Sequence, residues 1–281
     1  MSTQSQMVFA GALLVALCGI APAESGAKGQ LSPAELVKAV IRSEMNPAAV
    51  TDARWKYLVD KEVDRKQETR EVVETRSGSL DRLLAIAGRP LTGSAERAES
   101  ERIIKLSHDP GAPHQLELSH RKDATQCNAF LQMIPDAFLF EYAGASGDLV
   151  KLAFKPNPNF LPSSREGKVL HEMAGEIWVD ARQMRLVSLS GQLINEVKFA
   201  GGLLGHLEKG GRFSVKRAEI SPGHWEVKEI VVNMQGKVLL FKSISVQQKE
   251  LHSNFQPVRD DLTLFDAAGL LLKQAIVAAK Q

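Results

Sequence analysis

The chain is poor in the residues that build a covalent or aromatic framework. It contains two cysteines, Cys18 and Cys127, and aromatic residues make up only 6% of its 281 positions. Because Cys18 falls in a segment that we expect to be removed on export, the mature chain would keep a single cysteine and could form no internal disulfide. Stability must then come from a packed core, for which the chain is long enough.

The chain also lacks an excess of charge of either sign. Its 35 basic and 33 acidic side chains nearly cancel, and no run of like charge exceeds three residues. This balance excludes an electrostatic basis for binding nucleic acid or an anionic membrane surface, and it suits a neutral or apolar ligand. After residue 23 there is no run of eighteen apolar residues, so we expect the mature chain not to span a membrane.

The first 23 residues have the pattern of a signal peptide. An apolar stretch from Met7 to Ile20 is followed by Ala21-Pro22-Ala23, which favours cleavage after Ala23. We therefore expect a periplasmic or secreted protein. Met1 to Gln6 contains no Lys or Arg, so a buried N-terminal helix is the alternative. Attachment to the outer membrane by lipidation of Cys18 is disfavoured, because the preceding residue is Leu17 rather than a small one.

The pattern divides the rest of the chain into a linker, one main domain and a tail. Residues 24–31 read as the linker, residues 32–250 as the domain, and residues 251–281 as a C-terminal tail or helix. A helical insertion is expected at about residues 92–134. The domain opens with a capping box from Ser32 to Glu35, which predicts a helix as far as Met45.

Two-residue periodicity predicts strands on either side of the helical insertion. Trp55, Tyr57 and Val59 share one face of the first strand. A second set with the same spacing follows the insertion and consists of Phe138, Phe140 and Tyr142. Within the insertion, an apolar stripe on a helix from about His114 to Ile134 includes Cys127, which predicts that this thiol is packed.

The last third of the chain predicts five strands joined by short turns. Connections of two to six residues force antiparallel neighbours, so these strands should form a meander. The expected ranges are Val169–Val179, Arg185–Val197, Leu207–Ile220, Trp225–Met234 and Lys237–Lys249. With the earlier strands the total is about ten. The predicted fold is α+β and mainly antiparallel β, an incomplete half-open β-barrel with two or three helices covering its concave face.

The order of these features resembles the outer-membrane lipoprotein-sorting carrier family, the LolA/LolB-like proteins. The resemblance covers residues 32–250 and lies in the leader, the first helix, the hairpin that carries Trp55 and Tyr57, the helical insertion, and the segment from Gly175 to Val187. It implies an exported carrier whose concave apolar face holds acyl chains without catalysis. No site residue of the family can be transferred to a numbered position.

Side chains alternate between the two faces of a strand, and this alternation gives the candidate site. The shared faces of Trp55, Tyr57 and Val59 and of Phe138, Phe140 and Tyr142 are the hypothetical cavity lining. The alternative is that these side chains fill a closed core, as aromatic residues in strands commonly do.

No motif indicates catalysis, a metal ion or a cofactor. His108, His114 and His120 recur every six residues, which places the last two on opposite sides of a helix. Gly144–Gly147 lacks the glycine spacing of a nucleophile elbow, and Gly201–Gly205 has no Walker lysine. We therefore expect an exported, non-catalytic protein that binds a lipid or lipoprotein acyl chain. The alternative is an envelope module with a filled core and a protein partner, and an enzyme is the third reading.

Overall fold

The computed structural model describes residues 31–46, 53–202, 205–238 and 242–278. All elements discussed below belong to one compact unit, Ser32–Gln281. The expected signal peptide, nearly all of the expected linker and Cys18 lie outside the described residues.

The described residues form one antiparallel sheet of thirteen strands that does not close on itself. Its path is β4-β3-β2-β1-β13-β12-β11-β8-β7-β6-β5, and β9 and β10 form a short hairpin beside β12. The strands are β1 Arg54–Val63, β2 Lys66–Thr75, β3 Gly78–Ile86, β4 Arg89–Pro90, β5 Phe138–Ser146, β6 Leu149–Pro156, β7 Met173–Asp180, β8 Arg185–Leu193, β9 Val197–Phe199, β10 Gly205–Leu207, β11 Arg212–Ser221, β12 His224–Val238 and β13 Lys242–Val258. This is the predicted open, mainly antiparallel α+β fold.

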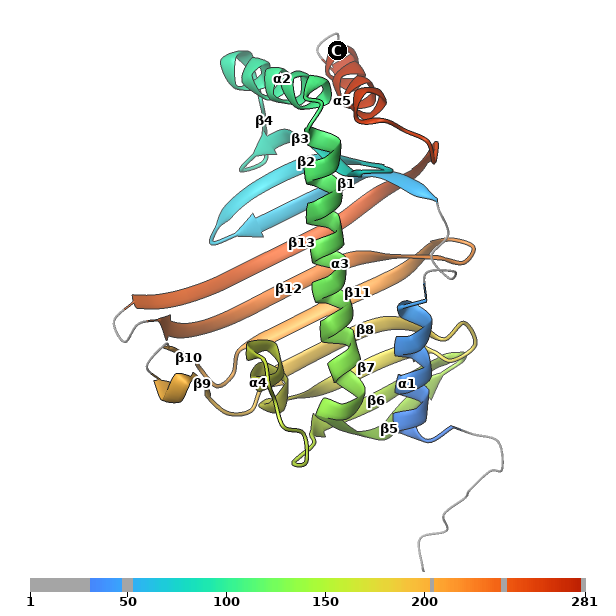
Figure 1. Cartoon of the computed structure of the whole chain (residues 1–281), viewed down its shortest axis with the longest axis vertical. Coiled ribbons are helices and arrows are strands. Elements are labelled where there is room, and N and C mark those ends of the chain that lie inside the picture. Colours follow the sequence, from blue (N-terminus) through green and yellow to red (C-terminus); the bar gives the residue numbers. More distant parts are fainter. Residues whose placement is uncertain (1–30, 47–52, 203–204, 239–241, 279–281) are drawn as a thin grey trace, which may run out of the picture. The chain divides into compact units, whose positions relative to one another are not determined.

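Five α-helices accompany the sheet in the described part of the chain. They are α1 Pro33–Glu44, α2 Gly93–His108, α3 Ala112–Ala137, α4 Arg165–His171 and α5 Leu264–Ala278, and η2 is a short 3-10 turn at Ala200–Gly202. The capping box predicted for α1 is present, because Ser32 Oγ accepts from Glu35 N and the Glu35 carboxylate accepts from Ser32 N. Figure 1 shows α3 crossing the strands from β3 toward β5.

One hydrophobic core, which we call the α1 core, covers one face of the sheet at its β5 end. Leu152, Ile177 and Leu189 stand opposite one another on β6, β7 and β8, so they share a face. We call this the α3 face. Leu36 and Val40 of α1 pack on it, together with Ile134 of α3 and Leu170 of α4.

A second core, the α5 core, covers the opposite face at the other end. The α3 face continues across the sheet from β8 to β1. The residues that stand opposite one another along it are Leu189, Val215, Ile230, Glu250 and Lys61. Alternation then places Trp55, Tyr57 and Val59 on the α3 face as well, and places Val73 and Leu80 on the opposite face. There Val73 and Leu80 pack with Ile103 of α2, Ala112 of α3, and four side chains of α5: Leu264, Ala267, Ala268 and Leu271. The two cores therefore lie on opposite faces at opposite ends of the sheet.

Several sequence predictions need correction. Gln235-Gly236 is not a turn, because β12 runs through it, and a Cβ on Gly236 would lie 2.2 Å from His206 O of β10. The glycine allows close approach of two strands rather than a reversal. The expected strand from Val169 begins instead as α4, and β13 extends past residue 250 to Val258.

Cys127 is exposed rather than packed. Its apolar stripe is regular, but this stretch of α3, residues 118–129, is exposed on every side. The count of about ten strands rises to thirteen because β4, β9 and β10, each of three residues or fewer, are too short to show a period.

Candidate functional site

The middle of α3 crosses the sheet without packing against it. Near its start Ala112 and Leu116 belong to the α5 core, and near its end Ile134 and Ala137 are buried in the α1 core. Between these ends every residue from 118 to 129 is exposed. A helix that packed on a sheet would bury one stripe of such a segment. The described residues therefore leave space between this stretch of α3 and the strands below it.

The sheet itself parts beneath α3. Pairing of β12 with β13 ends at Glu229 and Leu251. Beyond that point β13 continues only along β1 and the start of β12 continues only along β11. Register shifts accompany the separation on both sides, and Asn254 of β13 adopts a positive φ of 55°. Bulges of this kind bend and twist strands, which accounts for the divergence.

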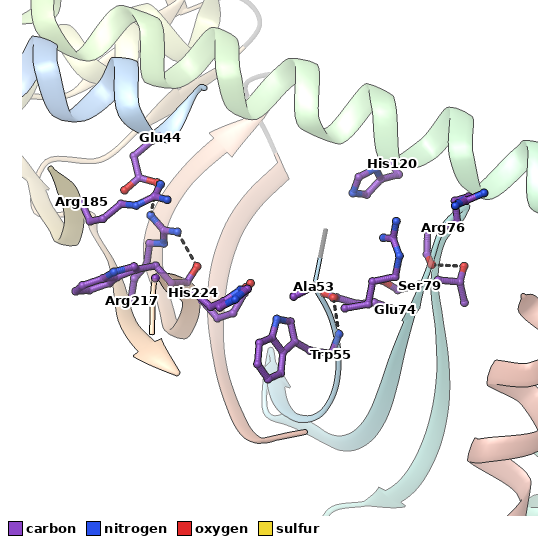
Figure 2. Close-up of a pocket in the computed structure, with 16 residues that line it drawn as sticks. Glu44, Ala53, Trp55, Glu74, Arg76, Ser79, His120, Arg185, Arg217 and His224 are labelled. Atoms are coloured by element: carbon purple, nitrogen blue, oxygen red, sulfur yellow. Dashed lines mark hydrogen bonds and ion pairs between the residues drawn. The ribbon is translucent and has the colours of Figure 1, made fainter. Parts of the chain in front are cut away.

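A polar cavity of about 370 Å³ occupies this parting of the sheet. Figure 2 shows His120 approaching it from α3 and Trp55 lying on the opposite side. Its charged and aromatic lining comes from α1, five strands, α3 and the turn between β2 and β3, and consists of Glu44, Arg54, Trp55, Glu74, Arg76, His120, Arg185, Arg217, His224, Trp225 and Glu226. We call this cavity the polar pocket.

Glu44, at the last turn of α1, joins three elements on one side of the polar pocket. Its Oε2 lies 2.6 Å from Arg217 Nη1 and 3.3 Å from Arg185 Nη1, and its Oε1 accepts from the backbone N of Leu186 at 2.7 Å. Only 6% of the Glu44 side chain is exposed. Because charged hydrogen bonds in such a protected place are strong, this cluster fixes α1 to β8 and β11.

Two further carboxyl groups line the pocket, and burial raises the pKa of both. Glu74 of β2 accepts from the backbone N of Trp55 at 2.9 Å, which partly opposes the rise in its pKa. The pKa of Glu226 of β12 is raised by burial and then by the negative charge of Glu74, and Arg217 opposes the increase. The two acids come from strands three places apart in the sheet order. Both line the same cavity, so the sheet brings them toward one another.

Below the exposed stretch of α3, the α3 face offers an apolar floor next to the polar pocket. Tyr57 stacks on Phe255 at 4.9 Å and on His252 at 5.5 Å between ring centroids. Further side chains on this face are only partly buried, namely Phe213, Val215, Ile230 and Val232. We call these side chains, with Val59, the floor. Phe213 also packs against the α1 core and Val59 is buried, but Val215, Ile230 and Val232 belong to neither core. An apolar ligand would therefore remove more of their surface from water.

A charged row borders the floor on β1 and β13. Glu250 Oε2 lies 3.5 Å from His252 Nε2, and Glu250 Oε1 lies 2.6 Å from Lys61 Nζ. These two partners, His252 first, lower the pKa of Glu250 to about 2 against the opposing effect of partial burial. The contact between Glu250 and His252 is an ion pair only when the imidazole is protonated. The pKa of Tyr57 is raised, by burial and by Glu74, Glu226 and Glu250.

The structure separates the two sets of residues proposed from the sequence. Trp55 lines the polar pocket, and Tyr57 and Val59 lie on the floor. The second set lies toward the other edge of the sheet. Phe138 is 3% exposed in the α1 core, Phe140 packs against that core, and Tyr142 is 41% exposed on β5.

Sequence reasoning missed the charged side of the site. Glu44 and Arg217 are far apart in the chain, and no local spacing links them. Only Glu74 could have been found from the alternation of side chains along a strand, because it follows Val72 on the same face of β2. Among the described residues no group of three or more His, Cys, Asp or Glu could hold a metal ion. None of the described helices is both long enough and apolar enough to cross a bilayer.

Comparison with known proteins does not assign the chain to a family. No protein-family model matches the chain, and no curated protein matches it. A solved structure of a DUF1329 family protein from Desulfovibrio piger aligns with 85% of this chain and all of its own, at 11% identity and a TM-score of 0.25. A TM-score this low does not establish a common fold, so the function must be argued from the residues of this chain.

Proposed function

We propose that this protein is an exported, non-catalytic carrier that holds the acyl chain of a lipid or lipoprotein between α3 and the floor. The observation that supports this most is the contrast along α3, which is buried at both ends and exposed from residue 118 to 129. A helix anchored in two separate cores can stay in place while a ligand enters beneath its middle.

The energetics of the floor suit a carrier. Burying about ten methylene groups gains on the order of 8 kcal/mol before the cost of association. Association and ordering consume roughly 4 kcal/mol or more of such a gain, so the net affinity permits release. Both walls of the space exist before binding, since the floor lies on paired strands and α3 is anchored at its ends. Little reorganisation is then required.

Two neighbouring valines of β12 provide a matched test. Val232 stands opposite Phe213 and Gln248 on the α3 face, whereas Val231 stands opposite Ser214 and Lys249 on the other face. A carboxylate in the floor would have to be desolvated by an acyl chain, which is costly. We expect Val232→Asp to weaken binding of a fluorescent fatty acid at least about tenfold, and Val231→Asp to leave it nearly unchanged.

The same assay decides the proposal. Protein purified without detergent should carry lipid, detectable by native mass spectrometry, and should bind the fluorescent fatty acid after delipidation. Protein that is repeatedly recovered empty and also ignores the fatty acid would contradict the carrier. Equal loss of binding in both valine variants would place the ligand elsewhere.

An envelope interaction module with a protein partner is the second candidate, and one observation favours it. Residues 141–146 of the edge strand β5 are all exposed, and β5 pairs only with β6 in the described part of the chain. Open edges can pair with another chain. Envelope pull-downs that lose a partner when Ala145 is replaced by proline would support this function over the carrier.

A further inference from the structure

The polar pocket lies at one end of the floor, where the polar end of a carried lipid would come to rest. Tyr57 on the floor and Trp55 in the pocket both contact the Phe255 ring, so the two regions are continuous. The lining of the pocket holds charges of both signs in nearly equal number. Four arginines face three glutamates, with His120 and His224 beside them.

Most of these charges are already engaged with the protein. Glu44 holds Arg217 and Arg185, as described above. Glu74 accepts from Trp55 N, and Arg54 Nε donates to the backbone oxygen of Asp260.

The side chains that remain come from different sides of the pocket. Within the described residues, the side chains of Glu226, Arg76 and His120 form no hydrogen bond or ion pair with the protein. Glu226 belongs to β12 and Arg76 to the turn between β2 and β3. His120 belongs to α3, as Figure 2 shows. The pocket thus offers one acid without a direct ion pair, attracted at longer range by Arg217, together with two basic groups. A lone anion would satisfy only the basic side, and a lone cation only Glu226.

We propose that the pocket receives a zwitterionic lipid headgroup that carries both a phosphate and an amine. The phosphate lies with Arg76 and His120, and the amine lies with Glu226, while the acyl chain lies along the floor. Arginine is well suited to phosphate, because its guanidinium can donate two parallel hydrogen bonds. A cation beside Glu226 offsets the cost of burying that carboxylate, a cost also visible in its raised pKa.

The inference rests on the proposed carrier function, and a comparison of headgroups tests it separately. The probes are phosphatidylethanolamine and phosphatidylglycerol with identical short acyl chains, and free phosphoethanolamine. Binding to the delipidated full chain is measured by calorimetry at pH 7. We expect phosphatidylethanolamine to bind about fivefold more tightly than phosphatidylglycerol, the size of one partly exposed ion pair.

Two variants assign the contacts. Glu226→Gln should remove the preference, and Arg76→Gln should weaken both lipids by a similar factor. Glu229→Gln is the matched acid control, because Glu229 lies on the same strand but pairs with Lys216 on the opposite face. Arg89→Gln, at an exposed position of β4, is the basic control. Both controls should bind both lipids like the unchanged protein.

The outcomes separate the two proposals. Equal binding of both lipids by the unchanged protein overturns the headgroup inference and leaves the acyl carrier intact. A preference that survives in Glu226→Gln also overturns it. Binding of free phosphoethanolamine without either lipid would support the pocket chemistry and contradict the carrier. If no probe binds, both proposals fail. Should Glu226→Gln not fold, the comparison of lipids on the unchanged protein still decides.

Discussion

The two ends of the sheet differ from its middle in what covers them. The β5 end is covered on the α3 face by α1, α3 and α4, and the β3 end is covered on the opposite face by α2 and α5. Strands β12 and β13 in between add no fully buried side chain to either core among the described residues, although Met234 of β12 packs against the α1 core and Val258 of β13 against the α5 core. In the proposed carrier, stability and ligand binding therefore depend on different parts of one sheet.

The same contrast is repeated along α3. Its exposed middle is twelve residues long, from 118 to 129. An isolated helix of about that length is marginal in water. Its persistence depends on the anchored ends, helped by the surface ion pair between Glu117 and Arg121. Loss of either core should therefore affect the helix above the floor as well as the strands below it.

The largest loss of stability is expected from a substitution of Glu44, which lies where the polar pocket meets the α1 core. Glu44→Ala removes the acceptor for Arg185, Arg217 and Leu186 N and leaves buried charges without their partner. We expect a loss of about 3–5 kcal/mol in the free energy of unfolding, measured by urea denaturation. Glu141→Ala, which breaks an exposed pair with Lys155, is the control and should change nothing measurable. A small loss in Glu44→Ala would show that the cluster does not fix α1.

Substitutions in the two cores test whether the two ends of the sheet are stabilised independently. Leu152→Ala in the α1 core and Leu80→Ala in the α5 core each remove a side chain that is at most 1% exposed. Each should cost about 2–5 kcal/mol in the free energy of unfolding. Because the cores share no residue, the losses should add in the double variant. Marked non-additivity would mean that the two ends act as a single core.

A smaller effect is expected from Glu250 in the middle of the sheet. Its pKa is about 2 in the folded protein, below the ordinary value of 4.5. A lowered pKa stabilises the fold above pH 4.5, and this contribution is lost as the pH falls from about 4.5 toward 2. Glu250→Gln should flatten the dependence of unfolding free energy on pH in that window. If Glu250→Gln left the slope of unfolding free energy against pH unchanged, the ion pairs of Glu250 would be contradicted.

For Glu226 we expect the smallest effect, and a contribution to the pH dependence of the unfolding free energy that is opposite in sign to that of Glu250. Its pKa is raised by burial and by Glu74, so ionisation disfavours the folded state as the pH rises above about 4.5. Glu226→Gln should therefore be at least as stable as the unchanged protein at pH 7 and should gain on it between pH 4.5 and 7. A loss of stability at pH 7 would mean that this carboxylate has a structural partner.

Local patterns predicted most elements of the fold. The capping box located α1 to within a residue, and turn chemistry predicted that the segments forming β7, β8, β11, β12 and β13 are successive antiparallel neighbours. The elements that were missed carry weak local signals. The seven residues of α4 are too few for a helical period, and Gly236 has the composition of a turn although it lies within a strand.

Only part of the site could be predicted. Parity gave Trp55, Tyr57 and Val59 a common face, which the structure places at the polar pocket and the floor. The same rule gave Phe138 and Phe140 a common face, yet they lie against the α1 core, because parity does not say which helix covers a face. The charged lining depends on the parting of β12 from β13, a tertiary feature without a local pattern.

Hydrogen–deuterium exchange along α3 tests the central claim most directly. In the delipidated protein, amides of residues 118–129 should exchange much faster than those near Ala112 and Ile134, because only the ends are held by cores. Addition of an acyl ligand should slow exchange in this middle stretch. Slow, uniform exchange along the whole helix, unchanged by ligand, would show that α3 packs on the sheet and that no space lies beneath it.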